Sequence, residues 1–429
     1  MAGPAIRALE LARALTARCE VTLAAPGRTP VDGLARIDAG LSDYDLLLDA
    51  ARAHDVVVAQ LLPPRLLTRV ARSPVRLAID FYNPTVIEVL EGTRSRPSAS
   101  RNRLRATVRA AATAHLAAAD FIACASERQR DLWLGAMALR GLLDPEPEAS
   151  EPALRSRIDV VPFGIPEQPP QSTAGGGAVL RDRLGIPADH RVLVWGGGIW
   201  DWLDAPTAIR ATALLPDDVH LVFLGAQRPA MAERDVHRAG AAAVELAREL
   251  GLEGTRVHFN EGWVPYAERG AWLRGADLGV SAHPDHLETR FAFRTRILDY
   301  LWAELPVVTT RGDELGDRVG REGLGRAVAS GDPDAFAAAC RDLLADPEPA
   351  RARVRAVAPE LSWRRAVGPL ERFCRSGTVR PGTIARDRAL RRATLAQYSP
   401  IAREALATDG APFLVRKLGR NLGRAIRRR

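Results

Sequence analysis

Residues 283–308 read HPDHLETRFAFRTRILDYLWAELPVV, and this stretch decides the fold that we expect. An apolar run at residues 278–281 leads into it as a strand, and residues 306–308 follow as a second buried strand. A charged turn and the start of a helix lie between the two. Open α/β sheets bind ligands at such places, where the carboxyl end of a strand feeds a helix. Helix N-termini also favour anions, so the stretch suits a ligand that carries phosphate.

Strands and helices alternate along the rest of the chain, which predicts parallel βαβ units. The first half has apolar strands at residues 21–25, 56–58, 77–79, 121–125 and 158–161, with helices at 6–17, at 101–119 and from Ser126. After a segment rich in Pro, Gly, Ser and Gln, the pattern restarts with strands at 192–195, 221–224, 256–259 and 276–281 and a helix at 205–215.

The predicted fold class is therefore α/β, with two Rossmann-like, doubly wound domains that face each other across a cleft. We expect an N-terminal domain at residues 1–166, a C-terminal domain at 178–375 and a basic tail at 380–429. The sequence opens directly at what reads as a βα turn, so the first strand of the N-terminal domain is missing. Either the start is placed too late, or the protein is truncated and inactive.

Composition excludes several classes of protein. The 429 residues are 47% hydrophobic, enough for sizeable cores, but no run of 18 apolar residues predicts a membrane span. No basic, apolar leader is present, so no signal peptide is predicted. The four cysteines are scattered without metal-ligand spacing, which favours neither a zinc site nor disulfides and fits the cytoplasm.

The net charge of +8 comes from the tail, because residues 380–429 hold 13 basic and 3 acidic residues and leave the rest of the chain near neutral. Apolar residues recur every fourth position at Leu414, Leu418, Leu422 and Ile426, with cations between them. This pattern predicts a basic amphipathic helix that binds an anionic membrane surface. A disordered basic tail is the alternative. Nucleic-acid binding is disfavoured because no aromatic residues are interleaved with the charge.

Several residues of the second half carry candidate chemistry. Residues 196–198 are three glycines that we expect in a loop after a strand, where the backbone can approach a diphosphate, although a structural turn is the alternative. Arg290 and Arg294 share one face of the expected helix and could bind phosphate bidentately, or form structural salt bridges. His286 and Glu288 suit hydrogen bonds to sugar hydroxyls better than a metal, because no second cluster of ligands accompanies them.

Other candidates have equally plausible structural roles. Asp299 could bind a ribose or form an ion pair within its helix. Asp80, at a strand end before Asn83, could face the cleft or cap a turn. Trp200 and Trp202 could stack on a base or pack in the core.

At this point the chain resembles the GT-B glycosyltransferases of the retaining family 4 kind, the group 1 transferases. The resemblance rests on residues 3–15 with 20–24, on 119–126, on 160–165 and above all on 288–308, and it spans roughly residues 3–375. It implies a nucleotide-sugar donor on the C-terminal domain, an acceptor on the N-terminal domain and retention of anomeric configuration.

The chain departs from the family pattern of two glutamates with seven residues between them, followed by Gly-x-Pro-Val. Counted back from Pro306, the second position holds Asp299, the first holds Phe291, and Glu304 replaces the glycine. Asp299 can keep the ribose contact, but Phe291 has no carboxylate, so Glu288 takes that role or the role is absent. A cationic pair expected after residue 196 is also missing, and nearby arginines would have to compensate.

We therefore expect a metal-independent glycosyltransferase without cofactors. It would use a nucleotide-diphosphate sugar and a cell-surface polysaccharide or lipid-linked acceptor, at the inner face of the plasma membrane. Replacement of Arg294 by alanine should abolish transfer with little effect on melting. The expected catalytic residues are Glu288, Arg294 and His286, the donor-binding residues Gly196, Gly197, Gly198, Arg290, Thr295, Arg296 and Asp299, and the acceptor-side residues Gly3, Arg7, Asp80 and Asn83.

Two other functions stay open. A non-catalytic GT-B-like subunit that partners another transferase would explain the missing strand and Phe291. A nicotinamide-binding Rossmann enzyme is disfavoured, because no GxGxxG with a downstream acidic residue follows a strand.

Overall fold

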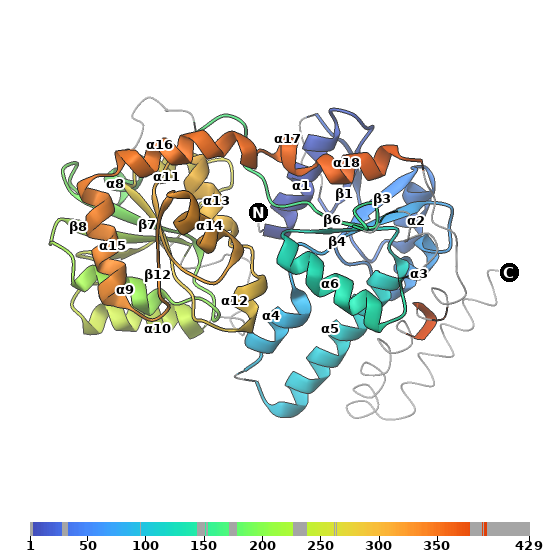
Figure 1. Cartoon of the computed structure of the whole chain (residues 1–429), viewed down its shortest axis with the longest axis horizontal. Coiled ribbons are helices and arrows are strands. Elements are labelled where there is room, and N and C mark those ends of the chain that lie inside the picture. Colours follow the sequence, from blue (N-terminus) through green and yellow to red (C-terminus); the bar gives the residue numbers. More distant parts are fainter. Residues whose placement is uncertain are drawn as a thin grey trace.

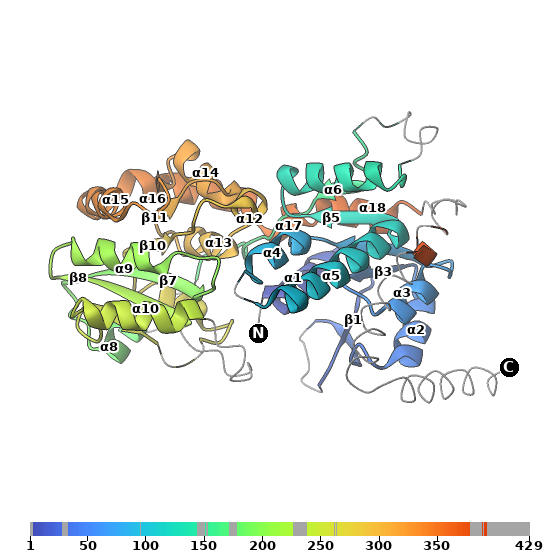
Figure 2. The same ribbon diagram turned by 90° about the horizontal axis from the view of Figure 1, so that it is seen from below.

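The computed structural model shows two parallel α/β sheets, each covered by helices (Figures 1 and 2). It describes residues 3–27, 33–94, 96–143, 151, 153–170, 178–225, 238–260, 262, 264–377, 388 and 390–392. The expected amphipathic helix of the tail lies outside the described residues. The α/β class and the parallel pairing predicted from the sequence are confirmed.

The N-terminal half holds a four-stranded parallel sheet in the order β3-β4-β5-β6, and a separate parallel pair, β1-β2. The strands are β1 (Thr22–Ala25), β2 (Ala35–Asp38), β3 (Val56–Ala59), β4 (Arg76–Asp80), β5 (Phe121–Cys124) and β6 (Ile158–Val160). The helices are α1 (Gly3–Leu15), α2 (Tyr44–Arg52), α3 (Pro64–Val70), α4 (Thr85–Glu91), α5 (Ser98–Ala118) and α6 (Glu127–Leu139).

Five predicted strands of this half are confirmed, and β2 was not predicted. Ser126 begins α6 as expected, since its Oγ accepts a hydrogen bond from the Gln129 amide. Within the described residues, the chain begins with α1 and no strand precedes it.

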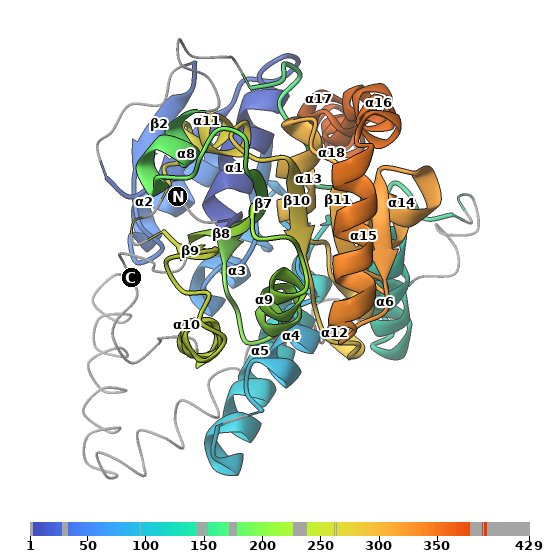
Figure 3. The same ribbon diagram turned by 90° about the vertical axis from the view of Figure 1, so that its left-hand side faces the viewer.

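The C-terminal half holds a six-stranded parallel sheet in the order β12-β11-β10-β7-β8-β9 (Figure 3). Its strands are β7 (Arg191–Gly198), β8 (Val219–Gly225), β9 (Val257–Phe259), β10 (Leu278–Ser281), β11 (Val307–Thr310) and β12 (Gly325–Val328). Its helices are α8 (Ala178–Leu184), α9 (Ala205–Ala213), α10 (Arg238–Glu249), α11 (Arg269–Leu273), α12 (Leu287–Phe291), α13 (Thr295–Trp302), α14 (Glu314–Glu322), α15 (Pro333–Ala345) and α16 (Glu348–Val357).

The last described helices return to the N-terminal half. α17 (Trp363–Ala366) and α18 (Gly368–Arg375) follow the short 3-10 helix η2 (Ala358–Leu361). The Phe373 ring stacks on Phe121 of β5 at 5.0 Å, and Arg76 of β4 donates to the Phe373 and Cys374 carbonyls. Residues 363–375 thus pack on the first sheet, although the sequence predicts them to be part of the C-terminal domain.

The chain crosses between the halves at two places that touch. Ile165 and Ser362 form a parallel bridge, and the Trp363 amide donates to the Ile165 carbonyl over 3.1 Å. A Cβ on Gly164 would lie 2.5 Å from the Trp363 backbone, so only glycine permits this approach.

A chain of three histidines links the start of β7 to β8 and β9. His190 Nδ1 lies 2.8 Å from His220 Nε2, and His220 Nδ1 lies 3.0 Å from His258 Nε2. Neutral rings that each donate from Nδ1 satisfy both contacts. Burial, together with the charge of a protonated His258 or His190, lowers the pKa of His220 to about 4.

We expect this histidine chain to make stability depend on pH. The ordinary pKa of histidine is 6.5, so His220 of the unfolded chain binds a proton as the pH falls through that value. In the folded protein, His220 stays neutral until about pH 4. Stability should therefore be lost between those values, and the melting temperature of His220→Phe should fall less over that range than that of the wild type. His54→Phe, in the other half, serves as the control. Parallel curves for the wild type and His220→Phe would contradict this role.

Candidate functional site

The strand order of the six-stranded sheet reverses between β7 and β10. The chain runs from β7 to β8 and β9 on one side, and from β10 to β11 and β12 on the other. Doubly wound sheets bind ligands outside the carboxyl ends of the strands at such a switch point. β7 ends at Gly198 and β10 at Ser281, so the stretch 283–308 leaves the sheet there.

The three glycines form the end of β7, and the expected loop at residues 196–198 is wrong. The ladder between β7 and β8 shifts register between Trp195 and Gly198, where Gly197 has a φ of 74°. A Cβ on Gly196 would lie 3.2 Å from the Tyr300 ring, and the Gly196 amide donates to Tyr300 Oη over 2.7 Å. Because these glycines have no side chains, β7 can continue past Trp195 with a bulge that lies beside α13.

Arg294 and Glu288 form a buried, bidentate ion pair beside the switch point. Arg294 Nη1 and Nη2 donate to the two Glu288 oxygens over 3.0 and 2.5 Å. Their side chains are 7% and 2% exposed. A buried pair of this geometry fixes the short connection between α12 and α13.

His286 begins α12 and its ring is held in one tautomer. Its Nδ1 accepts from the Thr289 amide over 3.2 Å and lies 2.9 Å from Thr289 Oγ1. Because Nδ1 accepts, the neutral ring carries its proton on Nε2.

Buried polar atoms without hydrogen-bond partners are concentrated around this point. Buried polar groups in folded proteins nearly always have partners, so a concentration of exceptions indicates a place for a ligand or water. Nε of Arg294, Nη1 of Arg296 and Nε2 of His286 present N–H donors, which favour an anion. Among the described residues, the atoms in this segment are Ser281 Oγ, His283 Nδ1, His286 Nε2, Arg294 Nε and Arg296 Nη1.

The three arginines of the segment lie in different surroundings. Arg296 donates from Nη2 to the Gly198 carbonyl over 3.0 Å and lies 4.8 Å from the Trp195 ring centroid. Arg290 is exposed on α12. Thr295 is the first residue of α13. The structure therefore brings Arg294 and Arg296 to the switch point, and leaves Arg290 at the surface.

Asp299 lies one turn along α13 and pairs with Arg269 of α11 over 2.9 Å. Its side chain is 40% exposed, so one face stays open to a ligand. The Arg269 guanidinium lies 3.7 Å from the Tyr266 ring centroid and 4.2 Å from that of Trp302. The expected intrahelical ion pair is wrong, because the partner comes from another helix. Glu304, at the family's glycine position, has a φ of 59°, the conformation that glycine adopts at no steric cost.

The expected acceptor-side residues lie in different surroundings. Arg7 is fully buried, and its Nε and Nη2 each donate to Asp80 over 2.7 Å. Its remaining bonds go to the Val161 and Pro162 carbonyls. These contacts give Arg7 and Asp80 a structural role, joining α1 to β4 and the end of β6. Gly3 is exposed, and Asn83 is half-buried before α4.

Two side chains of α6 hold the halves together beside the candidate site, and the sequence predicts neither of them. Arg128 of α6 donates to Asp317 of α14 over 2.7 Å and to the Gly312 carbonyl over 2.8 Å. Gln129 Nε2 donates to the Phe291 carbonyl at the end of α12 over 2.8 Å. Phe291 thus supplies its backbone, where the family pattern has a carboxylate.

His283 and Asp313 form a second missed feature. Both are fully buried, and His283 Nε2 lies 2.7 Å from Asp313 Oδ2. The other Asp313 oxygen accepts the Leu315 and Gly316 amides and begins α14. The pair ties the end of β10 to α14.

No metal site is found among the described residues, because no three His, Cys, Asp or Glu side chains come together there to hold an ion. None of the helices in that part of the chain is both long and apolar enough to cross a bilayer. The stacked rings of Trp200 and Trp202, 5.6 Å apart, lie just after β7.

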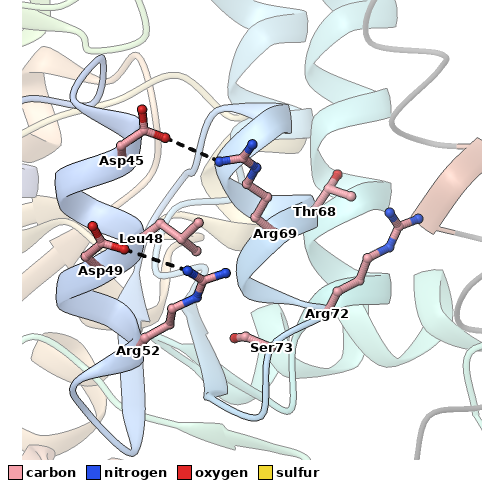
Figure 4. Close-up of a pocket in the computed structure, with 8 residues that line it drawn as sticks. All are labelled: Asp45, Leu48, Asp49, Arg52, Thr68, Arg69, Arg72 and Ser73. Carbon is pink, nitrogen blue, oxygen red and sulfur yellow. Dashed lines mark hydrogen bonds and ion pairs between the residues drawn. The ribbon is translucent and has the colours of Figure 1, made fainter. Parts of the chain in front are cut away.

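A surface pocket of about 560 Å³ lies between α2 and α3 (Figure 4), on the side of the N-terminal half away from the second sheet. Arg69 pairs with Asp45 at 3.4 Å and Arg52 with Asp49 at 3.7 Å across its wall. These exposed pairs contribute little to stability, and no strand end opens into the pocket, so the switch point is the better candidate site.

Known proteins resemble the half of the chain that holds the switch point. Residues 191–346 match the family model of the glycosyl transferases group 1. A D-inositol 3-phosphate glycosyltransferase of Xylanimonas cellulosilytica is 32% identical over 220 residues, which are 48% of this chain and 48% of that protein. The chain thus matches about half the length of this relative.

Solved structures share the fold over most of the chain. Sucrose-phosphate synthase from Thermosynechococcus elongatus aligns with a TM-score of 0.59 at 18% identity, covering 87% of this chain and 93% of that one. Anabaena HepE, solved in complex with UDP and glucose, aligns with a TM-score of 0.61 at 15% identity, covering 87% and 95%. Residues 191–346 are thus similar to the glycosyl transferases group 1, and the chain has a fold of the GT-B type.

Proposed function

We propose that the protein transfers a sugar from a nucleotide-diphosphate donor to a hydroxyl-bearing acceptor. The observation that carries this proposal is the concentration of unpartnered buried donors at the switch point between β7 and β10. Arg294, Arg296 and His286 present N–H groups there, and an anion such as a diphosphate would satisfy them. The matched domain and the HepE structure with UDP support the same ligand class.

The proposed reaction depends on the positive charges of Arg294 and Arg296. The bond between the anomeric carbon and the diphosphate breaks with its electron pair on the diphosphate, so negative charge grows where Arg294 and Arg296 lie. Preorganised donors in a water-poor site stabilise such charge strongly. The guanidinium groups supply the positive charge themselves, so the proposed mechanism does not require a metal. Retention of anomeric configuration and membership of family 4 are part of the proposal, by resemblance.

The acceptor and location complete the proposal. We propose a cell-surface polysaccharide or lipid-linked acceptor at the inner face of the plasma membrane. The basic tail supports membrane attachment, because each cation near an anionic leaflet contributes about 1 kcal/mol. Asp299 would bind the donor ribose with its open face.

A panel of UDP, GDP, ADP and dTDP in thermal-shift assays tests the proposal. One nucleotide should raise the melting temperature selectively, because a ligand at one hundred times its Kd stabilises the folded state by about 2.7 kcal/mol. Arg296→Ala should weaken that shift, and Arg353→Ala, on α16, is the control. If no nucleotide shifts the wild type, the non-catalytic subunit becomes the better reading.

A further inference from the structure

Helix α4 of the N-terminal half crosses to the candidate donor site. It packs against α12, and the two helices lie side by side in Figures 1 and 2. A Cβ on Gly92, which follows α4, would lie 3.8 Å from the Trp202 ring after β7. Glu88 shares a helix face with Gly92, because residues four apart lie one above the other. The face that bears Glu88 therefore looks toward the second half.

Glu88 lies near the buried Glu288–Arg294 pair. The two carboxyl groups repel each other, and Arg294 attracts both. Arg294 already donates from Nη1 and Nη2 to Glu288. No hydrogen bond to the Glu88 carboxyl occurs among the described residues. Two carboxyl groups thus lie near one guanidinium. Glu288 accepts its hydrogen bonds, and the Glu88 carboxyl accepts none from it.

Burial and the neighbouring charges determine the pKa of Glu88. Burial, and then the charge of Glu288, raise the pKa of Glu88 to about 7, while Arg294 opposes the shift. The other charged or titratable groups around α4 are Tyr82, whose pKa burial raises, and Arg105 of α5, which donates to the Leu90 carbonyl. A carboxyl that exchanges its proton near neutral pH suits proton transfer.

We propose that Glu88 is the catalytic base that the N-terminal half supplies to the transfer reaction, a role that rests on the proposed function. The Glu88 carboxylate takes the proton of the acceptor hydroxyl, and the hydroxyl oxygen bonds to the anomeric carbon on the face from which the diphosphate leaves, which keeps the anomeric configuration. The bond from that carbon to the diphosphate oxygen breaks, and its electron pair leaves on the diphosphate. The helix that carries Glu88 belongs to the half on which the acceptor is expected, and it faces the donor site.

Glu88→Gln tests the role, with Glu91→Gln as the matched control. Glu91 lies on the same helix, but its carboxylate is held by Arg94 at 2.5 Å. The probes are UDP-glucose, GDP-mannose, ADP-glucose and dTDP-glucose with water as the acceptor, and the readout is the release of nucleoside diphosphate. Glu88→Gln should slow release about 100-fold or more, while wild type and Glu91→Gln agree within about twofold.

Two further readouts separate catalysis from folding. Release by the wild type should rise with pH through about 7, and Glu88→Gln should lose this rise. Glu88→Gln should bind nucleoside diphosphate as the wild type does. It should not melt earlier, because an amide replaces a carboxyl that the fold prefers uncharged.

The outcomes distinguish the two proposals. Equal release by wild type and Glu88→Gln, however slow, would overturn the role of Glu88 and leave the donor site intact. If no nucleotide binds the wild type, both proposals fall together.

Discussion

Arg294→Ala is expected to lower the free energy of unfolding by about 3–5 kcal/mol and to abolish sugar transfer. The stability loss arises because Glu288, 2% exposed, would keep a buried carboxylate without its cation. The loss of transfer arises because the variant lacks one of the guanidinium groups that we propose to stabilise the developing charge. Thermal unfolding and nucleotide release measure the two effects on the same preparation.

Two companion variants sharpen this test. Arg290→Ala, four residues earlier and exposed, should change stability by no more than about 0.5 kcal/mol. Arg294→Ala combined with Glu288→Ala should recover part of the lost stability, since the unpaired charge is then gone. A double variant that is as unstable as the sum of both single variants would mean that the pair contributes nothing as a pair.

The structure changes one expectation here. The sequence predicts an Arg294 that can be removed with little effect on melting, because arginines on a helix are usually solvated. Burial is a property of the tertiary structure, and the spacing of Arg290 and Arg294 carries no information about it. In the fold, α12 ends at Phe291 and α13 begins at Thr295, so the two arginines do not share one helix.

The strands show what a sequence pattern can establish. β4, β5, β8 and β11 are buried along their whole length, as are the middle residues of β7, and each contains a short apolar run, so they could be predicted. β2 reads ARID and β12 reads GRAV, and their charged residues interrupt the same signal. Three consecutive glycines predict a loop because glycine has low strand propensity, whereas the close approach of Tyr300 to β7 requires residues without side chains.

The candidate site was predictable only in part. The switch-point segment was found because its charged turn follows an apolar strand. Glu88 was missed because it stands in VIEVLE, an ordinary helical pattern, and meets Glu288 only in the folded chain. His283 and Asp313 were likewise brought together by the pairing of β10 with β11. Contacts between residues far apart in sequence leave no local pattern to read.

Arg7→Ala is expected to destabilise the N-terminal half by about 3–5 kcal/mol, which decides between two roles for this residue. The sequence places Arg7 beside an acceptor, whereas the fold buries it with two hydrogen bonds to Asp80 and two to the carbonyls at the end of β6. Its guanidinium also lies 5.0 Å from the Tyr82 ring centroid and 5.1 Å from that of Phe163. The variant leaves Asp80 buried without its cation and frees α1 from the sheet.

The matched control is Arg13→Ala, on the same helix, whose side chain is 45% exposed and pairs with Glu10. It should melt within about 0.5 kcal/mol of the wild type, because exposed pairs contribute little. Arg7→Lys keeps the charge but not the planar fork, so it should fall between the two. If Arg7→Ala instead melts like Arg13→Ala and only weakens the use of acceptor, then Arg7 faces the cleft in solution. In that case the buried pair with Asp80 does not anchor α1, and the attachment of this helix must rest on the packing of its buried apolar side chains, Leu9, Leu11, Ala12 and Leu15.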